Sequence, residues 1–164
     1  MASVWDKTQT IPFIDIHTTG DEPEWARIGK STIFNLSLNA QTETLEFIED
    51  EVPTDAIKYY KPELPLELYT MEGDKAFDAM FELFEQLPTG KEAEKDMLLV
   101  FPKKDKTAST SFRAWKVSTM LIFTNFDTVA KKLYFNLNFK GNIQRGTVAI
   151  SSGSPTFTED TKNA

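Results

Sequence analysis

The sequence holds a single histidine, His17, and no cysteine in 164 residues. Within this chain, thiolate zinc sites, iron–sulfur clusters, disulfides and cysteine nucleophiles are therefore excluded, as is any metal motif that needs two histidines. A serine triad would have to use His17 as its base. The best candidate metal site is the group of carboxylates near this histidine, but their spacing does not fit a calcium loop and favours a solvated turn. These carboxylates are Asp15, Asp21, Glu22 and Glu24.

Motifs for phosphate binding or nucleophilic catalysis are also missing from the sequence. Gly29-Lys30-Ser31 resembles the end of a P-loop, but Glu24 stands where that loop needs its first glycine. Neither G-x-G-x-x-G nor G-x-S-x-G occurs. No pair of carboxylates combines an apolar and a polar setting, as general acid–base catalysis requires. We therefore expect a protein that is not an enzyme and that uses no cofactor and no metal.

Charge and composition point to one acidic domain. The 18 basic and 25 acidic side chains give a net charge of −7, which disfavours binding to a phosphate backbone. The length suits a single domain with its own core. The longest apolar runs, such as residues 97–101, are far shorter than a membrane span. The first residues lack the basic and apolar regions of a signal peptide, so we expect no secretion by that route.

Hydrophobic residues alternate with polar ones along most of the chain, which predicts a mainly β fold. The predicted strands cover residues 34–38, 42–48, 63–70, 97–101, 115–123, 133–139 and 147–150. Gly141-Asn142 is a turn signal, so the last two of these strands should form a hairpin. The expected architecture is an antiparallel β-sandwich or barrel-like core. The candidate core residues on these strands are Phe34, Leu36, Phe47, Leu66, Leu121 and Phe135.

One segment changes to helical spacing. Apolar residues recur at intervals of three and four between Asp74 and Leu87, which predicts one helix over the β core. Asp74 is the expected N-cap, and Pro88 and Gly90 should end the helix. We expect its apolar face in the core, with Phe77, Phe81 and Phe84 buried.

Three further stretches lack regular patterns. Residues 49–62 predict a long loop, acidic first and then aromatic and basic. Residues 103–111 predict a shorter exposed loop, and residues 151–164 a flexible C-terminal tail. The expected organisation is therefore one domain over residues 1–150, beginning with an N-terminal arm at about 1–24.

The order of these features resembles the major tail tube protein of long-tailed (siphovirus-type) bacteriophages. Trp25–Ile28 precedes an alternating strand and the long acidic–aromatic loop, after which come Glu67–Asp74, a Phe-rich helix and several further strands. The resemblance covers roughly residues 25–150. It implies a β-sandwich-like core flanked by one helix, and subunits that form stacked hexameric rings. It also implies a virion tail component, assembled in the host cytoplasm, that serves as the conduit for DNA ejection.

The resemblance further implies partners and contact residues. The partners would be other copies of the chain and tail proteins such as the tape measure and the tail terminator, while DNA passes through without specific binding. Polar faces of strands 42–48 and 63–70 would line the lumen, with Glu46, Glu63 and Glu67 facing the channel. The long loop would stack the rings, through Glu51, Asp55, Lys58, Tyr59 and Tyr60.

The sequence leaves three alternatives open. The chain could be another tube-like component, such as a contractile inner tube or a distal tail protein. It could be a monomeric β-sandwich module that binds carbohydrate through exposed aromatic rings. A hydrolase that uses His17 is the third alternative. The aromatic residues considered for the second alternative are Trp5, Trp25, Tyr59 and Tyr60.

Overall fold

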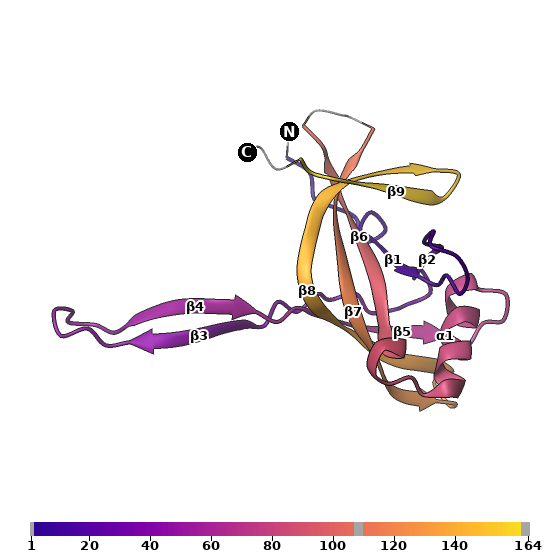
Figure 1. The fold of residues 1–164 in the computed structure, drawn as a ribbon, viewed down its shortest axis with the longest axis horizontal. Helices are drawn as coiled ribbons and strands as arrows, with labels where there is room; N and C mark the ends of the chain where they lie inside the picture. The colour runs from indigo at the N-terminus through magenta and orange to yellow at the C-terminus, as the bar shows by residue number, and fades with distance from the viewer. Residues whose placement is uncertain (1, 107–109, 162–164) are drawn as a thin grey trace.

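The computed structural model describes residues 2–106 and 110–161, and their fold is mainly β with one α-helix, as the sequence predicts (Figure 1). The helical elements are α1 (Lys75–Gln86) and a short 3-10 turn, η1 (Gly90–Ala93). The strands are β1 (Ile11–Asp15), β2 (Trp25–Arg27), β3 (Ala40–Leu45), β4 (Thr54–Tyr60), β5 (Glu63–Tyr69), β6 (Glu94–Lys104), β7 (Phe112–Asp127), β8 (Lys132–Ser151) and β9 (Ser154–Glu159).

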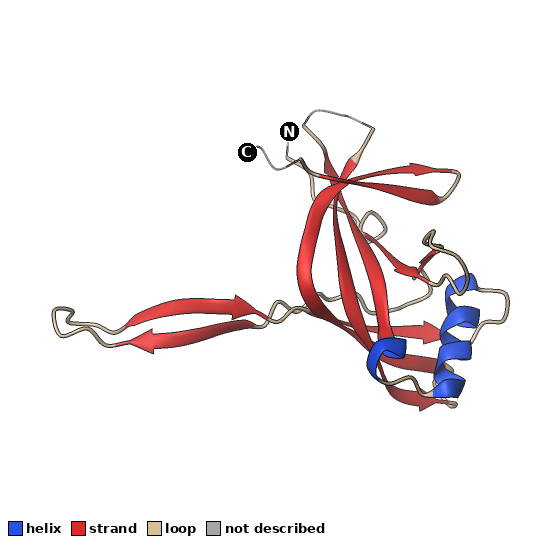
Figure 2. Cartoon of the chain, in the orientation of Figure 1, coloured by secondary structure: helices blue, strands red, loops and turns tan. Residues whose placement is uncertain are grey.

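Seven strands form one antiparallel sheet that curls into a nearly closed barrel. The order is β2-β1-β6-β7-β8-β5, and β9 pairs with the far half of β8. β3 and β4 form a separate two-stranded sheet that projects from the barrel as a long hairpin (Figure 1). Both helical elements lie at the end of the barrel where β5 ends (Figure 2). No helix among the described residues is long and apolar enough to cross a membrane.

The interior holds a large apolar cluster that α1 covers. Leu66, Leu121 and Phe135 are buried there, and Phe77 and Met80 of α1 pack onto them. Leu36 and Phe84 are partly buried against the same cluster. A second, smaller cluster around Phe13, Leu98 and Val148 lies toward β9.

Three of the expected core residues are exposed instead. Phe34 is 40% exposed because residues 34–38 form no strand and contact β5 only through the Ser37–Glu63 bridge. Phe47 is 52% exposed because it follows β3 at the far end of the hairpin. Phe81 is 37% exposed because it lies on the flank of the apolar stripe of α1. The predictions that placed these three rings in the core were wrong.

The helix follows its sequence signals closely. It begins after Asp74, whose backbone is extended as an N-cap requires, and ends at Leu87 in the left-handed conformation, just before Pro88. The predicted bounds are therefore confirmed. The Asp74 side chain makes no cap hydrogen bond.

The predicted hairpin at Gly141-Asn142 is wrong, because β8 runs through these residues without reversing. β7 pairs with β8 on both sides of this point, and its register shifts from Lys116–Gln144 to Ser118–Lys140. Three residues of β8 therefore stand opposite one of β7, which is a bulge. Gly141 adopts φ 72°, a conformation that glycine takes without strain and that serves a bulge as well as a turn.

Both ends of the chain contain more regular structure than expected. The N-terminal arm expected over residues 1–24 contains β1, which pairs with β6 and buries Ile14. The expected flexible tail contains β9, joined to β8 by a tight turn at Ser152 and Gly153, both with positive φ. Residues 162–164 of that tail lie outside the described residues. Within the expected loop 103–111, β6 extends to Lys104, and residues 107–109 also lie outside the described residues.

Candidate assembly site

The most unusual feature is the hairpin of β3 and β4, because it leaves the barrel without support from other elements (Figure 1). Its strands pair from Ala40–Tyr60 to Leu45–Thr54, with a bulge between Gln41 and Thr42. Two cross-strand contacts hold the register: Lys58 Nζ lies 3.2 Å from Glu43 Oε2, and the Thr44 hydroxyl donates to Asp55 at 2.9 Å. A two-stranded hairpin alone is only marginally stable in water. A partner surface would therefore stabilise it.

Large apolar side chains on the hairpin are half or more exposed. Ile57, Tyr59 and Tyr60 on β4 are each more than half exposed. The turn that joins the strands adds Phe47, Val52 and the fully exposed Ile48. Exposed apolar side chains gathered on one projecting element are typical of an interaction surface.

The residues expected in a ring-stacking loop all lie on this hairpin, but in strands more than in a loop. Glu51 lies in the turn, and Asp55, Lys58, Tyr59 and Tyr60 lie on β4. The loop expected over residues 49–62 is therefore wrong in form, because residues 54–60 pair with β3. The pattern missed this strand because both of its faces are exposed, so no polar–apolar alternation marks it.

A hollow of about 790 Å³ lies beside the root of the hairpin. It is bordered by Tyr60 and Pro62, by the bulged part of β8 and by Asp160 after β9. The root itself is fixed, since the Asn39 side-chain amide donates to the Lys61 carbonyl at 3.1 Å and the Lys61 amide donates to Leu38. The hairpin therefore meets the barrel at a defined, hydrogen-bonded junction.

The three glutamates expected to face a lumen do not share one surface. Glu46 lies just beyond β3 at the far end of the hairpin, while Glu63 and Glu67 lie on β5. Glu67 is only 4% exposed and lies 3.0 Å from Lys132 Nζ of β8. A hydrogen bond to Glu67 raises the pKa of Lys132. The lumen-facing position of Glu67 stays a prediction, and in the single chain its carboxylate is buried beside Lys132.

The outer face of the barrel strands therefore carries balanced rather than purely negative charge. On β8, Asn138 stands opposite Glu63, and Tyr134 stands opposite Glu67. On the same sheet Lys140 forms an ion pair with Glu94. Sequence alternation found the polar face of β5, but the lysine that pairs with Glu67 lies far along the chain, on β8.

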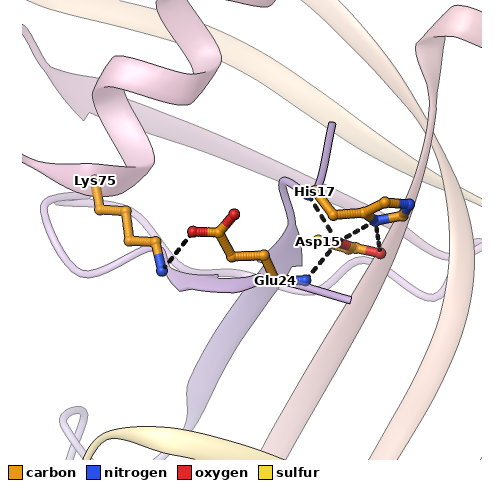
Figure 3. A network of polar contacts seen from close by, with 4 residues as sticks. All are labelled: Asp15, His17, Glu24 and Lys75. Carbon is orange, nitrogen blue, oxygen red and sulfur yellow. Dashed lines mark hydrogen bonds and ion pairs between the residues drawn. The ribbon is translucent and has the colours of Figure 1, made fainter. Parts of the chain in front are cut away.

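Two of the four carboxylates near His17, those of Asp15 and Glu24, take part in a structural network. Asp15 is buried, its carboxylate lies 2.7 Å from His17 Nδ1, and it accepts a hydrogen bond from the Glu24 amide at 3.0 Å (Figure 3). Glu24 in turn pairs with Lys75 at the start of α1. No group of three metal-ligating side chains occurs among the described residues. This network ties the β1–β2 connection to the helix.

The aromatic residues considered for carbohydrate stacking are not gathered on one surface. Trp25 lies on β2 and packs against the smaller core cluster, whereas Tyr59 and Tyr60 lie on the hairpin. β2 and the hairpin are on opposite sides of the barrel (Figure 1). The structure therefore offers no joint stacking platform from these residues.

Comparison with known proteins finds similarity in structure only, since no protein-family model and no curated protein matches the chain. A chain of the extracellular contractile injection system PVC, from its sheath/tube terminator in the extended state, superposes with a TM-score of 0.53 at 13% identity. The match covers 88% of this chain and 97% of that chain. A chain of the anti-feeding prophage tube terminating cap gives a TM-score of 0.47 at 17% identity over 90% and 95% of the two chains. The first comparison shows that the two chains share a fold along nearly their whole length.

Proposed function

We propose that this chain is a structural subunit of the tube of a phage tail or a phage-like contractile injection system, and that it assembles into rings with further copies of itself. The observation that carries the proposal is the projecting hairpin, whose large apolar side chains are half or more exposed. The shared fold with a chain from a sheath/tube terminator supports it. The role is structural, in keeping with the absence of any catalytic motif in the sequence.

Within this proposal, rings would be built from barrels and linked by hairpins. The barrel satisfies its own core, so it can fold before assembly. The hairpin carries apolar surface that becomes buried only against another subunit. The resemblance to siphovirus tail tube proteins implies six copies per ring, a lumen lined by residues 42–48 and 63–70, and partners such as the tape measure. On this proposal the assembled chain belongs to the tail of a particle.

A tube terminator is a second candidate, because the shared fold is with a chain from a terminator structure. The two roles differ in how assembly ends. A tube subunit stacks into open-ended filaments, whereas a terminator forms a ring that does not extend by itself.

The test is assembly of the purified chain followed by negative-stain microscopy. We expect rings with a central hole, and tubes if the chain is a tube subunit. The critical variant replaces residues 42–58 by Asn-Gly, which joins the paired residues Gln41 and Tyr59 through a two-residue turn. This variant should keep the circular dichroism expected for the intact barrel and should lose higher assembly.

The matched control is Glu82→Lys with Glu85→Lys, which changes exposed charges on α1 and leaves the hairpin intact. It should assemble like the natural chain. A natural chain that stays monomeric at high concentration would contradict the proposal. Normal assembly without the hairpin would show that the hairpin is not the contact element.

A further inference from the structure

Charge is divided unevenly between two distant parts of the molecule. The hairpin tip, residues 46–53, contains Glu46, Glu49, Asp50 and Glu51 and no basic residue. These four carboxylates make no ion pair with any other described residue. Between them stand the exposed apolar residues Phe47, Ile48 and Val52. The tip is therefore both acidic and apolar.

The opposite character is found where β6 and β7 meet. We call Lys103, Lys104, Lys106, Arg113 and Arg145 the basic end. Lys103, Lys104 and Lys106 are exposed and form no ion pair with the described residues. Arg113 is partly neutralised by Asp160 and Asp105, so the net charge of the basic end stays positive.

Partly exposed aromatic rings accompany these cations. Trp115 of β7 makes an edge contact with Phe101 of β6, with ring centroids 5.3 Å apart. The Arg145 guanidinium lies over the Trp115 ring at 5.8 Å. Both rings are only half-buried at the edge of the core. The basic end thus combines positive charge with apolar surface. Its charge is opposite to that of the acidic tip, and its apolar rings can pack against the apolar residues of the tip.

We infer that the hairpin tip docks on the basic end of a second copy of this chain. The inference rests on the proposed function and adds to it the surface that receives the hairpin. Contact within one molecule is excluded by distance, because the tip points away from the barrel while the β6–β7 end lies near the chain termini (Figure 1). Each copy carries one tip and one basic end, so the contact is head to tail and repeats along an assembly.

Charge reversal tests this contact without removing either element. The tip variant is Glu49→Lys, Asp50→Lys and Glu51→Lys, and the end variant is Lys103→Glu, Lys104→Glu and Lys106→Glu. In each variant alone, tip and basic end carry like charge, and the critical concentration for stacking should rise about tenfold or more. Mixed in equal amounts, the two variants should stack again, because the reversed tip of one meets the reversed end of the other. Stacking of the natural chain should also weaken as salt rises.

A cross-link supplies an independent measurement, since the natural chain has no cysteine. Glu49→Cys combined with Lys104→Cys should give a ladder of disulfide-linked multimers under oxidation. The single variants should give at most dimers. Glu82→Cys combined with Lys104→Cys is the matched control and should give no ladder.

The outcomes separate this inference from the proposed function. Rings or tubes that form normally in both reversed variants, with no cross-linked ladder, would overturn the inference and leave the proposed function standing. A natural chain that forms no assembly would overturn both. If the end variant loses binding to duplex DNA that the natural chain shows and still stacks normally, the basic end serves nucleic acid instead, and the inference is wrong.

Discussion

In the barrel, β8 is hydrogen-bonded along one edge to β7 and along the other to β5 and β9, whereas each strand of the hairpin has a single neighbour. Side chains differ in the same way. Leu64, Leu66 and Phe135 are fully buried in the barrel, and Ile57, Tyr59 and Tyr60 remain exposed on the hairpin. The hydrogen bonds and apolar contacts of the barrel are made within the chain. The hairpin has residues of the same types, and under the proposed function another subunit would cover them.

Under the proposed function, this contrast lets the chain fold first and assemble later. A barrel whose core is complete does not need the ring for stability, and a hairpin outside the core can change without unfolding it. Substitutions in the two regions should therefore affect different measurements. Those in the barrel should change the free energy of unfolding, and those in the hairpin should change assembly.

The largest effect on stability should come from Phe135→Ala. The ring is completely buried and contacts Phe123. We expect the free energy of unfolding to fall by about 3–5 kcal/mol, the cost of an unfilled cavity of this size. The matched change on the hairpin is Ile57→Ala, which should alter the free energy of unfolding by no more than about 0.5 kcal/mol. Denaturant unfolding of the monomer measures both, and equal losses would mean that the hairpin is part of the cooperative fold.

An intermediate effect should come from Lys132→Met. Without this lysine, the buried Glu67 carboxylate has no cation beside it, and the free energy of unfolding should fall by about 1–3 kcal/mol. Lys140→Met is the matched control on the same strand. Glu94, the partner of Lys140, is partly exposed, so Lys140→Met should lower the free energy of unfolding by no more than about 1 kcal/mol. A loss from Lys132→Met no larger than the control would show that Glu67 is hydrated.

The smallest effect concerns pH at the end of β9. Hydrogen bonds from the Arg113 guanidinium hold the pKa of Asp160 below its ordinary value of 3.8. A carboxylate with a lowered pKa in the folded state stabilises that state above its ordinary pKa, and the contribution disappears as pH falls through the folded value. The protection factors of the β9 amides, which correct for the pH dependence of intrinsic exchange, should therefore stay constant from neutral pH down to about pH 4 and fall below it.

Asp160→Asn is the control for this pH effect. It removes the titrating group, so the protection factors of the β9 amides should no longer fall below about pH 4. An unchanged step in this variant would assign the effect to another carboxylate.

The sequence alone determined the class of the fold and several of its elements. Strict alternation located β5 within one residue, and the spacing of Phe77, Phe81 and Phe84 with Asp74 and Pro88 fixed α1. These signals are local, because an element buried on one face repeats its apolar residues at its own period. The sequence also excluded cysteine and two-histidine chemistry within the chain, since those conclusions depend only on residue types.

Only the tertiary structure decided how these elements meet. An apolar residue on a strand looks the same in sequence whether the barrel covers it, as with Leu66, or nothing does, as with Ile57. Gly141 permits a positive φ in a turn or a bulge alike, and the long pairing of β7 with β8 selected the bulge. Glu67 became a buried ion pair because sheet register placed Lys132 nearby. Burial, register and pairing depend on contacts between distant segments, and such contacts leave no periodic signal in the chain.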